Sequence, residues 1–594
     1  MSGRTVRAAF FCAAAIGGVV STAHGQSIDA REYRLDNGMQ VLLVERHEAP
    51  TVMAAIFARV GSANETTGIT GISHLFEHMM FKGTETIGTK DIVRDREIIA
   101  RLDSIRELLR IEERAMREDY RRGRISSLSE PEAKSDRYRE LSAAFDEKIL
   151  EQRELLINNH LNEIYSKNGG FFLNAFTSED MTGYFVRVPR NKLELWMWLE
   201  SDRFMKPVFR EFYSERDVVR EERRLGVEST PTGLIEEDFA AMFWKSSSYH
   251  WDVIGWPSDL ENITREQAER YFDTYYAPNN LTMILVGDID TDRTIGMIRD
   301  YFERIPRGTV EPPDVVTLEE RQYAEKRMVA TAETSPETQI WYHTAPWKHP
   351  DGYALEVLAK ILSGKTGRLY ANLVEEKGIA KGSASRRGMF GGEGLEVGAE
   401  QDSRKYAGAF RLYATGTSGV RAERLEAAID EVLEDLKRNP VSDGELRKVK
   451  NQLRVDKIRF MDTMSGIGIL FYLGQNAALG DWTEANRNPD MCDLVTARDI
   501  LRVANTYFSR EQRNVLLIDP KETGDGSAEE GDPEFAKTAG MIRSMTDAAQ
   551  LGQMIGMFSM RMDSIEDPAE KESIGKLLEI ANARLKELKA AAAE

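Results

Sequence analysis

The chain has 594 residues, 41% of them hydrophobic and 30% charged, and its formal net charge is −19 at pH 7. A chain of this length exceeds what a single hydrophobic core supports, so we expect at least two domains. The acidic balance argues against nucleic acid and anionic lipid as partners, because both are bound through an excess of lysine and arginine.

The first 25 residues have the parts of an export signal. Arg4 and Arg7 form a short positive segment, residues 8–20 are an apolar run, and small residues lead to Gly25, as a signal peptidase favours. The apolar run is too short to span a bilayer, which argues against the alternative of a membrane anchor. We therefore expect residues 1–25 to be a cleaved signal peptide. The mature chain is then periplasmic or secreted, with no membrane span.

Strands and helices alternate after the signal. Residues 32–45 are predicted to form two strands around an Asn-Gly turn, and residues 51–61 a third strand. Residues 94–160 carry apolar side chains at spacings of three and four on a charged background, with a break at 122–133. This pattern predicts two antiparallel helical arms. The hairpin is either a solvated decoration, which we slightly favour, or an arm for docking a partner or for gating.

A helix, a polar turn and an apolar strand follow one another at 268–288 and again at 500–519. Both copies contain an aromatic pair, an asparagine and a final aspartate, which indicates a duplicated domain. Residues 521–534 are acidic and poor in apolar side chains, as in a linker. The expected parts are a signal peptide (1–25), an N-terminal domain (26–308) with an inserted hairpin (94–160), a C-terminal domain (320–520), and an acidic linker with a helical tail (521–594).

Residues 71–84, GISHLFEHMMFKGT, place His74, Glu77 and His78 on one expected helix. Residues four apart lie on the same helix face, so both imidazoles can bind one ion, and Glu77 reaches the edge of that site. A carboxylate there can take a proton from an attacking water. Paired histidines alone often cap or ion-pair on an exposed helix. The glutamate between them favours a catalytic metal site.

A catalytic zinc site has three protein ligands and one open position, so a third ligand must come from elsewhere. The expected helix SERDVVREERRLG (214–226) offers Glu215 and Glu222, which are two turns apart on one face. Glu222 can bind the ion while Glu215 holds a histidine or orients the site from behind. A glutamate-rich helix considered alone is more often a solvated face.

The order of these motifs resembles the inverted zincin family of pitrilysin, insulysin and the mitochondrial processing peptidase. HLFEH followed by MMFKGT, NAFTSEDMTGY (174–184) and ERDVVREE (215–222) carry the resemblance, which covers most of residues 30–520. It implies one zinc ion per chain. The implied metal ligands are His74, His78 and Glu222, and the implied catalytic residues are Glu77, as the base, and Glu215, as its support.

The resemblance also implies how a substrate binds. In the family, a peptide adds as an extra strand to a sheet edge, which corresponds here to Asn174, Ala175, Phe176 and Thr177. Recognition of backbone at a sheet edge tolerates many sequences; an isolated NAFT would be an ordinary hairpin strand. The implied fold is α+β, with two homologous domains and the inserted hairpin. Each domain is expected to be an antiparallel sheet with helices on one face.

The chain departs from the family at a second motif. Active members use an arginine and a tyrosine in a pattern like LRxxxGLxY, whereas this chain has LVEEKGIAK at 373–381, with Val374 and Lys381 at those positions. Valine offers no donor to a developing negative charge. We therefore expect a related second subunit to supply the pair in a heterodimer, with a homodimer as the alternative.

Three functions fit these observations. We favour a zinc-dependent endopeptidase that cleaves unfolded peptides and needs a partner subunit. The alternative is a catalytically inactive assembly or structural subunit that retains the fold and the metal, although such relatives usually lose ligands and none is lost here. The third is a zinc-binding scaffold in which the helical hairpin is the functional part.

Overall fold

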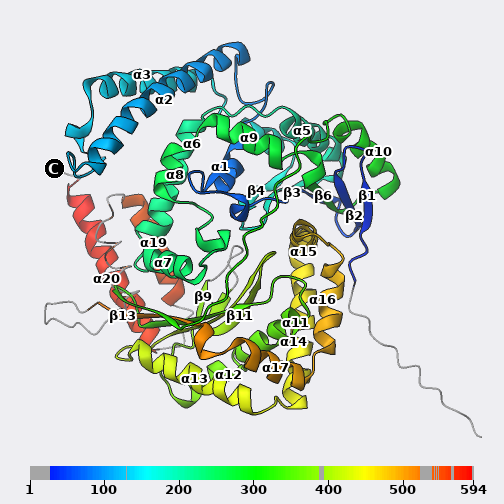
Figure 1. The fold of residues 1–594 in the computed structure, drawn as a ribbon, viewed down its shortest axis with the longest axis vertical. Coiled ribbons are helices and arrows are strands. Elements are labelled where there is room, and N and C mark those ends of the chain that lie inside the picture. Colours follow the sequence, from blue (N-terminus) through cyan, green and yellow to red (C-terminus); the bar gives the residue numbers. More distant parts are fainter. Residues whose placement is uncertain are drawn as a thin grey trace, which may run out of the picture.

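A computed structural model describes residues 27–521 except 129 and 387–392. It also describes 548–562, 568–591 and a few single residues between 538 and 545. The expected signal peptide and most of the expected acidic linker lie outside the described residues. Figure 1 shows the N-terminal half above the C-terminal half, with a long helical hairpin above both.

The first sheet has six strands in the order β1-β2-β6-β3-β5-β4, so β4 forms one edge. All neighbouring strands are antiparallel except β2 and β6, which run parallel. β3 is buried along almost its whole length, because both faces of the sheet are covered. The strands are β1 (Arg31–Arg34), β2 (Gln40–Glu45), β3 (Thr51–Ala58), β4 (Phe171–Thr177), β5 (Thr182–Pro189) and β6 (Leu281–Gly287).

Most helices of the N-terminal half pack on one face of this sheet in a single hydrophobic core. The exception is α7 (Gly233–Phe243), because its Phe239 packs against strands of the C-terminal half. Outside the hairpin, the helices of this half are α1 (Ile72–Met79), α4 (His160–Lys167), α5 (Leu193–Met205), α6 (Phe212–Arg223), α7 (Gly233–Phe243), α8 (Pro257–Asn262), α9 (Arg265–Tyr275) and α10 (Thr291–Phe302).

The opposite face of the first sheet is covered by α15 (Ile467–Leu479), which comes from the C-terminal half of the chain. Leu470 of α15 shares a core with Phe57 of β3. The approach is close because Gly474 lies against the Phe57 ring, where an added Cβ would be 2.3 Å from a ring carbon. Helices therefore cover both faces of this sheet, whereas we expected helices on one face only. The second layer comes from the other half of the chain.

The second sheet has five strands in the order β11-β12-β8-β13-β7. Read from its other edge, the order is β7-β13-β8-β12-β11, and it corresponds to β2-β6-β3-β5-β4 of the first sheet. In both sheets the first two strands of this series are the parallel pair. The predicted duplication is thus visible in the topology. The strands are β7 (Lys326–Ala332), β8 (Glu337–Thr344), β11 (Val397–Ser403), β12 (Gly408–Thr415) and β13 (Arg513–Pro520), with a separate pair β9 (Ala384–Arg386) and β10 (Glu393–Leu395).

The C-terminal half has its own core, formed between the second sheet and the helices on one of its faces. The helices of this half besides α15 are α11 (Pro350–Leu362), α12 (Arg368–Tyr370), α13 (Ala422–Arg438), α14 (Asp443–Met461), α16 (Glu484–Leu494) and α17 (Ala497–Tyr507). The predicted α+β class with two homologous domains is confirmed. Each sheet is mixed, not purely antiparallel, because the strands of the parallel pair are joined by long connections and not by a hairpin.

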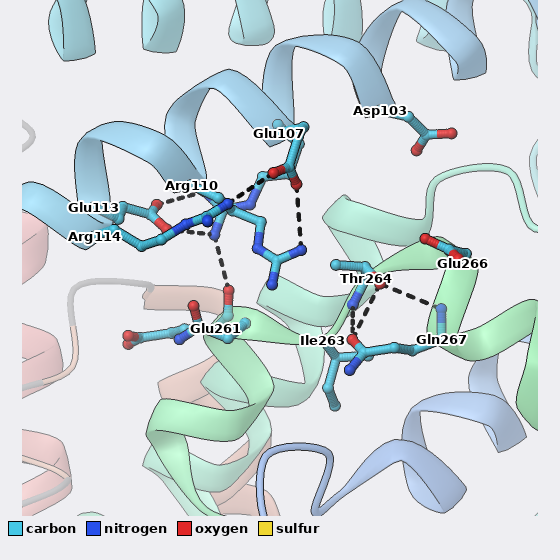
Figure 2. Close-up of polar contacts among 12 residues, drawn as sticks. Asp103, Glu107, Arg110, Glu113, Arg114, Glu261, Ile263, Thr264, Glu266 and Gln267 are labelled. Atoms are coloured by element: carbon cyan, nitrogen blue, oxygen red, sulfur yellow. Dashed lines mark hydrogen bonds and ion pairs between the residues drawn. The ribbon is translucent and has the colours of Figure 1, made fainter.

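The segment inserted between α1 and β4 forms two antiparallel helices, α2 (Ile92–Arg121) and α3 (Asp136–Leu155), which pack along an apolar seam. Arg106 of α2 donates to the backbone oxygen of Glu261 at 3.1 Å. Figure 2 shows α2 lying across the segment that joins α8 to α9. The hairpin is therefore fixed to the N-terminal domain by polar contacts as well as by its base.

Two helices of the tail, α19 (Ala548–Met562) and α20 (Pro568–Ala591), pack on each other through apolar side chains. Leu551 and Leu577 are buried between them. Of the helices in the described parts of the chain, none is long and apolar enough to cross a membrane.

Candidate functional site

The helix α1 carries the first three candidate residues, and its start is firmly held. Gly71 precedes the helix with φ of 85°, in the left-handed region that glycine tolerates best. The Glu65 carboxylate accepts hydrogen bonds from the backbone N–H groups of Gly71 and Ser73, both at 2.8 Å. These N–H groups belong to the first turn, where no intrahelical acceptor exists. The buried face of α1 packs into the first core, which leaves His74, Glu77 and His78 on the other side.

The helix α6 packs against α1 and brings Glu222 opposite both histidines. Glu222 Oε2 lies 3.8 Å from His74 Nε2 and 3.6 Å from His78 Nε2. Ligand atoms on a tetrahedral zinc, with bonds of about 2.0–2.1 Å, are about 3.3 Å apart. The three side chains offer ligand atoms within 4.8 Å of one another, and they form the one such group found among the described residues. Two imidazoles and a carboxylate are a donor set that suits zinc.

The protonation of the first histidine also suits a ligand. His74 is largely buried, and burial lowers its pKa to about 4. The imidazole is therefore neutral at physiological pH, which is the form that binds metals. His74 Nδ1 is buried without a hydrogen-bond partner among the described residues, so no side chain there fixes the tautomer of this ring.

Glu215, one turn from the start of α6, supports the second histidine from behind. Its Oε2 lies 3.3 Å from His78 Nδ1, while Lys82 forms an ion pair with its other oxygen. Burial acts to raise the pKa of Glu215, but the hydrogen bonds from His78 and Lys82 outweigh burial and lower it. An ionised Glu215 fixes the proton of His78 on Nδ1, so that Nε2 is free to face Glu222.

Glu77 is half-buried, and burial raises its pKa above the ordinary value. Its Oε2 accepts a hydrogen bond of 2.7 Å from the hydroxyl of Thr177, which lies at the end of β4. A carboxylate with a raised pKa beside a metal site could act as a general base near neutral pH.

The four residues expected at the substrate edge lie on β4, the terminal strand of the first sheet. The Asn174 side chain is exposed and accepts from the backbone N–H of Ala175 at 2.9 Å. Ala175 and Phe176 are 8% and 6% exposed, because Ala175 packs into the first core and Phe176 packs on the opposite face, which α15 covers. The strand offers its backbone at the edge, while the Thr177 hydroxyl contacts Glu77.

Sequence reasoning missed three contacts of this site: those made by Glu65, by Lys82 and between Thr177 and Glu77. An acidic residue shortly before a glycine that starts a helix could have indicated the role of Glu65. Lys82 lies just after the end of α1, and no sequence signal pairs it with Glu215 on α6. No sequence signal links Thr177 to Glu77, because 100 residues separate them.

The segment that departs from the family pattern lies in the C-terminal domain. Val374 is partly buried against the second core, and the Lys381 backbone N–H donates to Thr415 O at 2.9 Å. Neither residue has a side chain equivalent to the arginine or the tyrosine of the pattern.

Comparison with protein families identifies the chain. Residues 40–100 match the description "Insulinase (Peptidase family M16)", and residues 262–453 match "Peptidase M16 inactive domain". Both matched regions are therefore similar to domains of the peptidase M16 family. The expected relationship to pitrilysin and the mitochondrial processing peptidase is thereby confirmed.

Individual relatives agree with this family. The chain is 25% identical over 521 residues to "Zinc protease PqqE" of Helicobacter pylori, covering 85% of this chain and 98% of that protein. It is 21% identical over 513 residues to a "Probable mitochondrial-processing peptidase subunit beta" of Arabidopsis thaliana, covering 84% and 81%. The crystal structure of a protease from Helicobacter pylori has the same fold, with a TM-score of 0.65, 22% identity, and coverage of 83% and 100%. With the His–His–Glu group, these relationships place the chain among the metalloproteases.

Proposed function

We propose that the chain is a zinc-dependent endopeptidase that cleaves unfolded peptides, with one zinc ion held by His74, His78 and Glu222. The observation that carries the proposal is the approach of Glu222 Oε2 to both imidazole Nε2 atoms, at 3.8 and 3.6 Å. When bound, zinc lowers the pKa of a water molecule and polarises the carbonyl of the scissile bond.

The protein side chains supply the proton transfers and the orientation. Glu77 accepts the proton of the attacking water and delivers it to the leaving amine. Glu215 acts from behind the site by holding His78 in the tautomer that leaves Nε2 free. Lys82 keeps Glu215 ionised, because it is the counter-charge of that carboxylate.

The substrate peptide adds to β4 as a further antiparallel strand through Asn174, Ala175, Phe176 and Thr177. The terminal position of β4 and the proximity of α1 to this strand support the assignment. Backbone hydrogen bonds then place the scissile bond beside Glu77 with little dependence on sequence.

The chain works with a related second subunit, as a heterodimer, or else as a homodimer. The reason is chemical: Val374 and Lys381 stand where family members have the arginine and tyrosine that stabilise the oxyanion. One relative is itself named as the beta subunit of a peptidase, which supports this arrangement. Cleavage of residues 1–25 as a signal peptide delivers the chain to the periplasm or the exterior, with 26–308, 320–520 and 521–594 as its parts.

The test is cleavage of a quenched fluorescent peptide by the purified mature chain, with zinc measured in the same sample. We expect about one zinc per chain, and activity that falls by at least about 10³-fold in Glu77→Gln while zinc is retained. If the chain binds zinc but cleaves only after a copurifying subunit is added, the result supports the heterodimer. Zinc without cleavage under any pairing supports the alternative, an inactive assembly or structural subunit. Absence of zinc contradicts the proposal.

A further inference from the structure

The hydroxyl of Thr177 makes a contact that substrate binding does not require. It donates to Glu77 Oε2 at 2.7 Å, across two elements that are 100 residues apart in the chain. Thr177 ends β4, where it pairs with Thr182 of β5, so its backbone is held by the sheet. Threonine is β-branched and has few χ1 rotamers, so a fixed backbone also fixes the direction of the hydroxyl.

The turn that follows Thr177 is bound to the loop that starts α1. The backbone N–H of Ser62 donates to Ser178 O at 3.2 Å, and that of Ala63 donates to Glu179 O at 2.8 Å. The two segments are in close contact, since a Cβ on Gly61 would lie 2.1 Å from Ser178 O. The same loop contains Glu65, which holds the first turn of α1. The turn therefore shares one rigid support with the helix that carries Glu77.

The turn is also bound to the C-terminal domain. Glu179 forms an ion pair with Arg404 at 2.8 Å, and Asp180 accepts from the backbone N–H of Lys405 at 3.0 Å. The hydroxyl of Tyr249 donates to Asp180 at 2.8 Å, and the Arg404 guanidinium lies 4.9 Å from the Tyr249 ring centre. Two adjacent acidic side chains of this turn thus bind the segment that joins β11 to β12.

We propose that Thr177 is a positioning residue that sets the direction of the Glu77 carboxylate, and that the C-terminal domain holds Thr177 in place through Glu179 and Asp180. The inference rests on the proposed role of Glu77 as the base. Without the hydroxyl, the carboxylate of Glu77 rotates about its last side-chain bonds and points to the open position for only part of the time. A displacement of about 1 Å at a reacting group can cost about 100-fold in rate.

The first experiment compares Thr177→Val, which keeps the shape and removes the hydroxyl, with Thr177→Ser, which keeps the hydroxyl. Thr86→Val is the matched control, because the Thr86 hydroxyl donates to the Asp202 carboxylate at 3.3 Å on an exposed surface. We expect Thr177→Val to lower kcat about 10- to 100-fold with KM within about twofold and zinc content unchanged. Thr177→Ser and Thr86→Val should stay within about threefold of wild type. Thr177→Ala replaces the valine variant if the latter does not fold.

A second readout does not depend on activity. Crystal structures of the zinc-loaded variants should show the Glu77 carboxylate rotated or in several conformers in Thr177→Val, and as in wild type in Thr177→Ser. A Glu77 side chain that is unchanged in Thr177→Val overturns the inference. If the zinc-loaded wild type cleaves nothing in any pairing, the proposed function fails, yet the position of Glu77 still decides the role of Thr177.

The contribution of the C-terminal domain is tested with Glu179→Gln, which removes the ion pair to Arg404. Glu434→Gln is the control, since Glu434 forms ion pairs with Lys437 and Arg438 on the surface of α13. In Glu179→Gln we expect faster amide hydrogen exchange over residues 177–182 than in wild type, and a severalfold lower kcat. Neither change is expected in Glu434→Gln. Equal exchange and equal kcat in the two variants would overturn this part of the proposal.

Discussion

The two halves of the molecule share the order of five sheet strands, but only the N-terminal half carries the candidate metal site found among the described residues. In the N-terminal half, α1 follows β3 and presents two histidines and a glutamate on its open face. In the C-terminal half, α11 follows β8 at the corresponding point, and its side chains are mostly apolar and buried. The same backbone arrangement therefore supports a reactive centre in one domain and a packed core in the other. Function depends on a few side chains that the shared fold does not specify.

The largest expected difference between the halves concerns the metal. Glu222→Gln on α6 should weaken zinc binding by more than about 100-fold, because a direct ligand is lost and second-layer changes alone cost 10–100-fold. Asp456 lies on α14, the helix that packs against α11 as α6 packs against α1, and it pairs with Lys360 of α11. Asp456→Asn should leave zinc binding unchanged. Competition with a fluorescent chelator measures both. Equal zinc affinity in the two variants would show that the site lies elsewhere.

A smaller effect is expected behind the site. Glu215→Gln keeps the shape of the side chain but removes the charge that His78 and Lys82 contact, so zinc affinity should fall by about 10- to 100-fold. Chelator competition at constant pH gives the affinity. An unchanged affinity would mean that Glu215 has no part in orienting His78.

The contact between the halves can be tested through two helical glycines. Gly474→Ala forces α15 away from the Phe57 ring and should destabilise the protein by about 1–3 kcal/mol. Gly352→Ala on α11 meets only an ordinary contact, at 3.8 Å, and should be neutral or stabilising by up to about 1 kcal/mol, because alanine favours helix. Thermal or urea unfolding distinguishes them. Similar stability of the two variants would contradict the close packing of α15.

The smallest effect is a dependence of stability on pH. Burial raises the pKa of Asp180 to about 6, above the ordinary 3.8. The folded state thus retains this proton more strongly than the unfolded state, so its contribution to stability is greatest below about pH 3.8 and declines as pH rises to about 6. A shift of this size corresponds to at most about 3 kcal/mol. The partial exposure of Asp180 to solvent reduces the expected loss to on the order of 1–2 kcal/mol. Asp180→Asn should flatten this part of the curve of unfolding free energy against pH, and an unchanged curve would contradict the assignment.

Local patterns in the sequence predicted much of this structure. The spacing of His74 and His78, the pair Glu215 and Glu222, and the two arms of the hairpin all depend on the periodicity of a single helix. The duplication was predicted from two segments that have the same order of helix, turn and strand. These features need no knowledge of how distant segments meet.

Long-range contacts could not be predicted in the same way. α15 is apolar on almost all sides, which indicates burial, but nothing in its sequence says that it covers the sheet of the other half. The hydrogen bond from Thr177 to Glu77 joins an edge strand to a helix across the inserted hairpin. The parallel pairs arise because strands far apart in sequence are adjacent in the sheet.

The proposed activity depends on one zinc ion held by His74, His78 and Glu222. The most direct measurement is anomalous diffraction from crystals of the mature chain, at wavelengths on either side of the zinc absorption edge. We expect one peak per chain, about 2.0–2.2 Å from the Nε2 atoms of His74 and His78 and from a carboxylate oxygen of Glu222. No peak at these residues in zinc-loaded crystals, or a peak bound by other side chains, would contradict the proposal.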